Sequence, residues 1–268
     1  LFKRGGIQIK ENKYDDNTFF QKYSQMSRSQ QGLAGAGEWE TLRKLLPDFK
    51  DKRVLDLGCG YGWHCIYAME HGASSVVGVD ISHKMLEVAK EKTHFPQVEY
   101  KCCAIEDVEF PEESFDVILS SLAFHYVADY EILVKKIYRI LKSGGKLVFT
   151  VEHPVFTAYG TQDWYYNEKG EILHFPVDNY YYEGKRTAVF LGEKVTKFHR
   201  TLTTYLNTLL SNGFIINHIV EPQPPENMMD IPGMRDEMRR PMMLIVSANK
   251  KVDRLAEVDN KNYLQLRN

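Results

Sequence analysis

The chain has 268 residues, of which 43% are hydrophobic, so it is long enough to bury a complete core, and we expect one domain with insertions. A formal net charge of −2 leaves no broad basic surface to neutralise a phosphate backbone, which argues against a nucleic-acid partner. The four cysteines contain no C-x-x-C pair, so we expect no metal site and no disulfide framework. No apolar run is long enough to cross a membrane and no signal-peptide pattern opens the chain, so we expect a cytoplasmic protein with no membrane partner.

The N-terminal 37 residues are predicted to form an arm and a lid ahead of the core. Residues 1–13 are polar and basic, and aromatic residues then recur at near-helical spacing around Tyr23 before a glycine-rich run at residues 32–37. This segment is either an amphipathic helix packed on the core or a cover for a ligand, and the sequence leaves both open. A helix over residues 38–46 follows and ends before a proline.

The core is predicted to begin at residues 54–62, Val-Leu-Asp-Leu-Gly-Cys-Gly-Tyr-Gly, which are typical of a strand followed by a glycine turn and then a helix. Glycine has no Cβ, so such a turn lets a ligand lie against the backbone. About twenty residues further on, a second apolar strand ends at Asp80, where α/β nucleotide folds hold ribose hydroxyls. Trp63 stands where a dinucleotide fold has its third glycine, and the carboxylate of Asp56 inside the motif suits a ligand that carries an amino group.

Strands and helices alternate through the rest of the core. Ser82 is predicted to cap a helix over residues 83–92. The remaining expected elements are strands at 97–103, 115–121 and 146–151, a helix at 130–141, and, later in the chain, a helix at 201–210 and strands at 214–220 and 242–248. This alternation predicts a doubly wound α/β fold with a parallel sheet, and ligands bind such sheets at the carboxyl ends of their strands.

Residues 56–62, Asp-Leu-Gly-Cys-Gly-Tyr-Gly, resemble the first motif of the class I S-adenosylmethionine-dependent methyltransferases, and Asp80 matches the ribose-binding acid of that family. Residues 54–127 and 141–150 follow the order of the family's core and look most like its type 11, small-molecule branch. The resemblance implies a Rossmann-like, mostly parallel seven-stranded sheet whose last strand is antiparallel. It also implies S-adenosylmethionine as the cofactor and direct transfer of its methyl group to a small molecule.

The same resemblance assigns cofactor contacts to a set of residues. They are Tyr23, Arg28, Asp56, Gly58, Cys59, Gly60, Asp80, Ile81, Ala104, Ile105, Glu106 and Ser120. In this family a backbone N–H and a nearby polar side chain after the third strand contact adenine. The usual acid at that point is replaced here by Cys103 or Ala104, which leaves side-chain recognition of the adenine amino group open but keeps the backbone contact.

The alternation breaks after the fifth strand, where residues 152–198 form an aromatic-rich insertion with a predicted hairpin around Gly192 and Glu193. A β flap needs aromatic side chains for its own small core, and such side chains can also cover a substrate or form a homodimer interface, so these alternatives stay open. We therefore divide the chain into an arm and lid (1–37), a cofactor-binding core (38–151), the insertion as a substrate cover (152–198), the C-terminal part of the sheet (199–249) and a polar tail (250–268).

A sulfonium methyl group is already activated, so the enzyme has mainly to align a nucleophile and exclude water, and it needs a general base only for a protonated nucleophile. His125, just after the fourth strand, and His153, just after the fifth, are the candidate bases, and a structural histidine is the alternative for each.

The residues at the end of the fourth strand narrow the class of acceptor. Residues 120–123 are Ser-Ser-Leu-Ala and not the Asn/Asp-Pro-Pro-Tyr/Phe motif of amino-directed nucleic-acid methyltransferases, which favours a small-molecule acceptor. Two other functions remain as alternatives: an NAD(P)-dependent oxidoreductase on a similar sheet, and an S-adenosylmethionine-binding protein without turnover.

Overall fold

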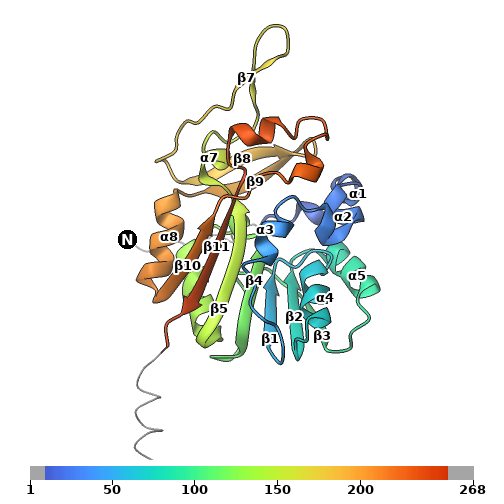
Figure 1. Cartoon of the computed structure of the whole chain (residues 1–268), viewed down its shortest axis with the longest axis vertical. Coiled ribbons are helices and arrows are strands. Elements are labelled where there is room, and N and C mark those ends of the chain that lie inside the picture. Colours follow the sequence, from blue (N-terminus) through green and yellow to red (C-terminus); the bar gives the residue numbers. More distant parts are fainter. Residues whose placement is uncertain (1–9, 253–268) are drawn as a thin grey trace, which may run out of the picture.

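The structure is a computed structural model of the chain and describes residues 10–252; residues 1–9 of the predicted arm and 253–268 of the predicted tail lie outside the described residues. Its centre is a seven-stranded sheet in the order β10-β11-β5-β4-β1-β2-β3 (Figure 1). Strands β1 to β5 are parallel to one another, whereas β11 is antiparallel to both of its neighbours. This confirms the predicted doubly wound, mostly parallel sheet with an antiparallel last strand.

The strands of this sheet are β1 (Arg53–Leu57), β2 (Ser75–Asp80), β3 (Val98–Cys102), β4 (Phe115–Ser121), β5 (Leu141–Glu152), β10 (Phe214–Val220) and β11 (Met243–Lys250). The helices that pack on it are α3 (Trp39–Arg43), α4 (Trp63–Glu70), α5 (His83–Lys92), α6 (Tyr130–Ile140) and α8 (Leu202–Ser211). Consecutive side chains of a strand point to opposite sides of the sheet, so apolar residues lie on both faces, and helices pack on both. In β1, Leu55 and Leu57 join the buried cluster that includes α6 and α8, while Val54 joins the one that includes α3 and α4.

Local sequence signals fix several element boundaries. The Ser82 hydroxyl accepts a hydrogen bond from the Met85 N–H at 3.2 Å, which confirms the predicted cap of α5. β5 begins at Leu141, ahead of the predicted start of this strand at residue 146. Phe115 pairs with Leu141, whereas Val117 pairs with Lys146, so the extra residues between the two pairs are taken up as a bulge.

The N-terminal segment lies beside α4 and α5 at one end of the sheet (Figure 1). Its elements are η1 (Lys13–Asp15), α1 (Asn17–Ser24), α2 (Ser27–Gln30) and η2 (Gly32–Gly35). The carboxylate of Asp15 accepts hydrogen bonds from the Ser82 hydroxyl at 2.6 Å and from the Lys84 N–H at 3.2 Å. The segment is therefore fastened to the first turn of α5.

The insertion is built from α7 (Pro154–Ala158) and two small antiparallel sheets, β6 (Tyr165–Tyr166) with β7 (Ile172–His174) and β8 (Gly184–Phe190) with β9 (Glu193–His199). The β8–β9 turn is Leu191-Gly192, and both residues have positive φ, as a type I′ turn requires. The predicted hairpin is thus present, with its turn one residue earlier than expected.

The connection from β10 to β11 contains η4 (Glu226–Met228) and η5 (Asp236–Arg239) and packs on the insertion. Arg240 stacks over the rings of Phe156, Trp164 and Phe175 at 4.5, 5.0 and 4.7 Å from their centroids. The β6–β7 hairpin projects from this region at the top of the molecule (Figure 1). Much of the aromatic content of the insertion therefore stabilises the insertion itself.

Candidate functional site

A cavity opens at the carboxyl ends of β1, β2, β4 and β5, the edge at which parallel sheets bind ligands. Its walls come from the N-terminal segment, the glycine turn, the loops after β2, β3 and β4, the end of β5, the end of β8 and the start of β11. The lining residues are Lys10, Glu11, Tyr14, Tyr23, Met26, Arg28, Gly58, Gly60, Asp80, Ile81, Met85, Ala104, Ile105, Glu106, Ser121, Leu122, Ala123, His125, Tyr126, Val127, Glu152, Phe190, Met242 and Met243.

The glycine turn after β1 shapes the floor of this cavity, and its glycines serve different purposes. Gly58, Gly60 and Gly62 all have positive φ, so each is in a backbone region that other residues avoid. A Cβ on Gly58 would lie 2.4 Å from the Ala123 Cβ, and one on Gly62 would lie 2.2 Å from the Tyr100 hydroxyl. At Gly60 the nearest atom is the Met85 Cε at 3.4 Å, so this glycine keeps space open on the cavity side.

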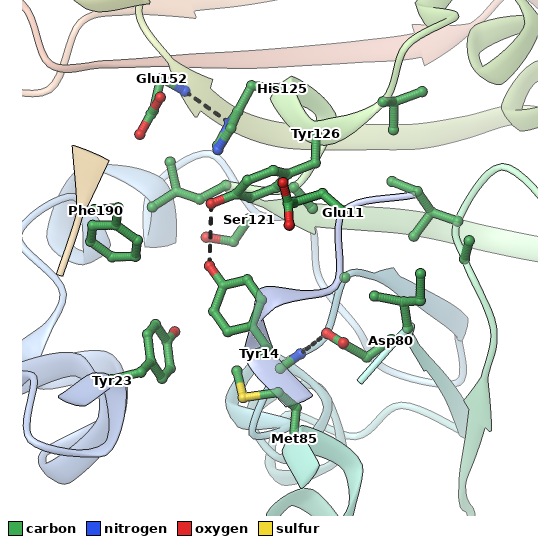
Figure 2. A pocket seen from close by; sticks show the side chains of 18 of the residues that line it. Glu11, Tyr14, Tyr23, Asp80, Met85, Ser121, His125, Tyr126, Glu152 and Phe190 are labelled. Atoms are coloured by element: carbon green, nitrogen blue, oxygen red, sulfur yellow. Dashed lines mark hydrogen bonds between the residues drawn. The ribbon is translucent and has the colours of Figure 1, made fainter. Parts of the chain in front are cut away.

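Asp80, the last residue of β2, directs its carboxylate toward the cavity (Figure 2). One oxygen accepts a hydrogen bond from the Gly60 N–H and the other from the Ser82 N–H, both at 2.9 Å. Burial raises the pKa of this carboxyl, although the hydrogen bonds from Ser82 and Gly60 oppose the shift. Each oxygen keeps a second lone pair, so the carboxylate has the capacity to bind two adjacent hydroxyls.

Asp56 and Cys59 are not among the described residues that line the cavity. The Asp56 carboxylate is buried; one oxygen is 3.5 Å from the Cys65 Sγ, and the other has no hydrogen-bond partner within residues 10–252. Burial raises the pKa of Asp56 to about 7. Cys59 lines a smaller adjoining pocket together with Arg28, whose guanidinium pairs with Glu38 at 2.9 Å. Asp56 is not among the described lining residues of either pocket, and its unpaired buried oxygen is an acceptor without a donor.

Ser121 lines the cavity, whereas its neighbour Ser120 was the predicted cofactor residue. The Ser120 hydroxyl is buried and donates a hydrogen bond to the Leu57 carbonyl oxygen at 2.7 Å. Successive side chains of a strand alternate between its two sides, so only one of the two serines can face the cavity. The structure therefore places Ser121 where the sequence placed Ser120.

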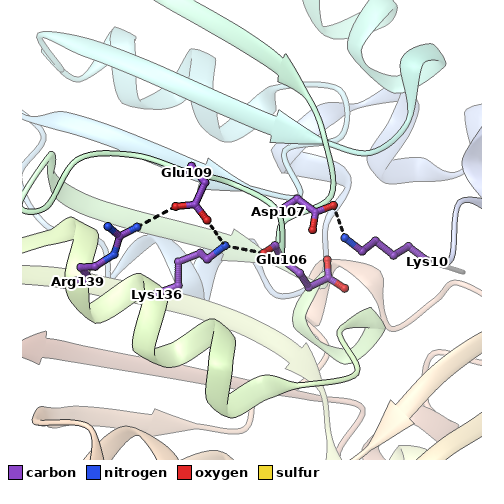
Figure 3. Close-up of polar contacts among 6 residues, drawn as sticks. All are labelled: Lys10, Glu106, Asp107, Glu109, Lys136 and Arg139. Carbon is purple, nitrogen blue, oxygen red and sulfur yellow. Dashed lines mark hydrogen bonds and ion pairs between the residues drawn. The ribbon is translucent and has the colours of Figure 1, made fainter. Parts of the chain in front are cut away.

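The loop after β3 is held in place by ion pairs from two directions (Figure 3). The Lys136 ammonium donates to the Glu106 carbonyl oxygen at 2.7 Å and to the Glu109 carboxylate at 2.9 Å. From the opposite side, Lys10 pairs with Asp107 and so joins the N-terminal segment to this loop. The backbone that presents the predicted adenine contacts is thus fixed by contacts from α6 and from the N-terminus.

Aromatic side chains of the N-terminal segment, Tyr14 and Tyr23, line the cavity (Figure 2). The Tyr14 ring makes edge contacts with Phe19 and Tyr23 at centroid distances of 5.1 and 5.2 Å, and its hydroxyl lies 3.3 Å from that of Tyr126. From the insertion, Phe190 contacts Phe19 at 5.7 Å and also lines the cavity. Tyr14, Tyr126 and Phe190 were not predicted as site residues, because no local motif marks them.

The two candidate histidines have different surroundings. His125 lines the cavity, and its Nδ1 accepts a hydrogen bond from the Glu152 N–H at 3.4 Å. Burial lowers the pKa of His125 to about 4, so the ring is neutral near pH 7 and its proton is on Nε2, which makes it a donor toward the cavity.

His153 is not among the described residues that line the cavity. Its Nδ1 accepts a hydrogen bond from the Val155 N–H at 3.1 Å and so caps α7, while its Nε2 lies 2.8 Å from a Glu221 oxygen. These contacts are those of a structural histidine. Within residues 10–252 there is also no cluster of three or more metal-binding side chains, and no helix that is long and apolar enough to cross a membrane.

Comparisons with known proteins agree with this geometry. A family model described as a methyltransferase domain matches residues 55–149. The fold is similar to that of a Listeria monocytogenes protein assigned to the S-adenosylmethionine-dependent methyltransferases, with 57% identity and a TM-score of 0.79 over 82% of this chain and 99% of that one. A second similar structure is an S-adenosylmethionine-dependent methyltransferase from Mesorhizobium loti, with 41% identity and a TM-score of 0.75 over 81% of this chain and 100% of that one.

A Ubiquinone biosynthesis O-methyltransferase from Coxiella burnetii is 36% identical over 41% of this chain and 47% of its own length. The match to the family model covers the glycine turn, Asp80 and the loop after β3, which are the parts that form the cavity floor. The two solved structures are similar to this chain over nearly their whole length, so the similarity extends beyond residues 55–149. The chain belongs to the S-adenosylmethionine-dependent methyltransferases.

Proposed function

We propose that the protein transfers the methyl group of S-adenosylmethionine to a small-molecule acceptor bound in the same cavity. The observation that carries this proposal is that a single cavity, lined in part by Tyr14 and Phe190, extends from Asp80 at the end of β2 to Glu152 at the end of β5. A concave cavity lined by aromatic rings and a few polar groups suits a small acceptor better than a polymer. The C. burnetii relative, a ubiquinone biosynthesis O-methyltransferase, is in keeping with such an acceptor.

The residues present fit the cofactor. Asp80 has free lone pairs for the two ribose hydroxyls, and Gly60 leaves the backbone open beside it. The loop after β3 offers backbone groups to adenine. We retain Asp56 as the partner of the amino group, because one of its buried oxygens has no hydrogen-bond partner within residues 10–252. Arg28, beside the glycine turn, is suited to a carboxylate. We retain Tyr23, Ile81, Ala104, Ile105, Glu106, Gly58 and Cys59 as cofactor contacts in this proposal.

When bound, S-adenosylmethionine supplies a methyl group that its sulfonium already activates. The protein then has to orient the acceptor and exclude water, and the rings of Tyr14, Tyr23 and Phe190 serve the second purpose. His125 acts as a hydrogen-bond donor in this scheme and not as a general base, since its Nδ1 lone pair is used by the Glu152 N–H. We also retain the proposal that the N-terminal segment, described from residue 10 to residue 37, forms a lid and that residues 152–198 form a cover. Phe190 is the residue of this cover that lines the cavity.

Incubation with labelled cofactor and a dialysable metabolite extract tests this function. We expect S-adenosylhomocysteine to form with the dialysable fraction and not with the macromolecular fraction, and Asp80→Ala to lose this activity. Product formed only with the macromolecular fraction would exclude a small acceptor. Tight binding of NAD(P)H without binding of S-adenosylmethionine would instead favour the oxidoreductase alternative.

A further inference from the structure

The cavity has two ends, and the order of the strands separates them. Most of the predicted cofactor residues lie on β1 and β2 and in the loops that follow β1, β2 and β3, whereas β5 and β11 are on the other side of β4. Glu152 ends β5, and Met242 and Met243 lie at the start of β11. We call the end of the cavity formed by these elements and their neighbours the acceptor end; it is lined by Glu11, His125, Tyr126, Glu152, Phe190, Met242 and Met243.

Glu152 is the most constrained charged group at the acceptor end. One of its oxygens accepts a hydrogen bond from the Lys197 ammonium at 2.5 Å, and the other accepts one from the Gln162 amide at 2.7 Å. Lys197 also donates to the Gln162 carbonyl oxygen at 2.9 Å and is itself only 2% exposed. The carboxylate is thus fixed by two side chains of the insertion, 10 and 45 residues away in sequence.

The carboxylate is charged and still has room for a ligand. Burial alone would raise the pKa of Glu152, but the charge of Lys197 and the hydrogen bonds from Lys197 and Gln162 hold it below its usual value. Each oxygen has a second lone pair beyond the bond it already accepts. Lys197 is not among the described residues that line the cavity, so a ligand at the acceptor end meets the carboxylate and not the ammonium.

The other groups at this end favour the same kind of ligand. Glu11 is a second carboxylate, and one of its oxygens accepts the Thr196 N–H at 2.7 Å, which holds it at the wall. The rings of Tyr126 and Phe190 lie near Glu152 in the cavity wall (Figure 2). Aromatic faces attract cations, and the Lys197 ammonium lies 5.5 Å from the centroid of the Phe190 ring. The cations that line the cavity, Lys10 and Arg28, are at the cofactor end and are paired with Asp107 and Glu38.

We propose that the methyl acceptor carries a positively charged nitrogen group, an ammonium or guanidinium, and that Glu152 binds this group. The inference rests on the proposed function and adds the chemical class of the acceptor. Glu152 is a specificity residue in this view, and Lys197 and Gln162 position it. An acceptor with a carboxylate or phosphate at this point would meet Glu152 and Glu11 and would be repelled.

Binding of three probes that share a phenethyl group tests the proposal: phenethylamine, phenethyl alcohol and hydrocinnamate. Their affinities are measured by calorimetry on the full chain saturated with S-adenosylhomocysteine. We expect phenethylamine to bind at least about tenfold more tightly than hydrocinnamate. Equal or tighter binding of hydrocinnamate or phenethyl alcohol, or no binding of any probe, overturns the inference. Failure of S-adenosylhomocysteine itself to bind would overturn the proposed function instead.

Variants locate the effect at Glu152. Glu152→Gln is expected to weaken phenethylamine binding by about tenfold and to leave S-adenosylhomocysteine binding unchanged. Because this change leaves the Lys197 charge buried without a counter-charge, the double variant Glu152→Gln/Lys197→Gln provides a second test with neutral partners. Glu131→Gln is the matched control, since Glu131 pairs with Lys135 at 2.7 Å on the surface of α6. Unchanged phenethylamine affinity in both Glu152 variants would refute the assignment.

Discussion

Gly58 in the glycine turn has no room for a side chain, and this yields a quantitative prediction for Gly58→Ala. Gly58 has φ +79°, and a Cβ there would lie 2.4 Å from the Cβ of Ala123. A residue with a side chain in the left-handed region costs about 1–2 kcal/mol, and forcing an extra methyl group into a packed site costs about 1–3 kcal/mol. We therefore expect Gly58→Ala to lower the free energy of unfolding by about 2–5 kcal/mol.

The two contributions can be separated with Ala123→Gly, which removes the atom that the new methyl group meets. The next nearest atom, the Ala123 Cα, would be at an ordinary contact distance of 3.9 Å. The double variant Gly58→Ala/Ala123→Gly should regain the steric part of the lost free energy of unfolding, about 1–3 kcal/mol. The loss that comes from the left-handed backbone conformation should remain. Gly60→Ala is the matched control: it also has positive φ, but its Cβ would meet only the flexible end of Met85 at 3.4 Å.

Urea unfolding followed by tryptophan fluorescence measures all four variants, and the difference between the single and double variants gives the coupling free energy. Gly60→Ala should lose only about 1–2 kcal/mol, the conformational part. Two results would refute this reasoning: Gly58→Ala as stable as the wild-type protein, or a double variant less stable than Gly58→Ala alone. Either result would mean that the contact between residue 58 and Ala123 does not determine the loss of stability.

Three further predictions concern the site. Asp80→Ala should weaken S-adenosylhomocysteine binding by about 1.5–3 kcal/mol, because bonds from the ribose hydroxyls to a charged group are lost, and an unchanged dissociation constant in a folded variant would contradict this. Burial lowers the pKa of His125 from 6.5 to about 4, so the unfolded chain binds more protons than the folded protein between these pH values. The free energy of unfolding should therefore fall by about 3 kcal/mol as the pH drops from about 6.5 to about 4. Urea unfolding of His125→Asn should show a smaller fall over the same pH range, and an equal fall in the variant and the wild-type protein would refute this. His153→Ala should cost about 0.5–2 kcal/mol of stability through the lost cap of α7 while methyl transfer persists, so a folded variant without activity would restore His153 as a catalytic candidate.

Local sequence patterns were sufficient to predict the sheet and the floor of the cavity. The strand, glycine turn and helix at residues 53–70 come from neighbouring residues whose apolar side chains and lack of Cβ atoms dictate the backbone. The cap at Ser82 and the Leu191-Gly192 turn are local in the same sense. Asp80 was identifiable because the end of a strand next to a glycine turn is a fixed position in such sheets.

Tertiary packing determined which side chains surround the acceptor end. Tyr14 meets Tyr126 across 112 residues, Glu11 meets Thr196 across 185, and Glu152 meets Lys197 across 45. Contacts between residues so far apart in the chain produce no hydrophobic periodicity or motif in the sequence around either residue, so the sequence alone does not indicate them. The same limit applied to Ser120 and His153, whose hydrogen bonds to Leu57 and Val155 engage them outside the cavity. A sequence pattern specifies which way a backbone runs, but the direction of one side chain at the end of a strand depends on what the rest of the chain packs beside it.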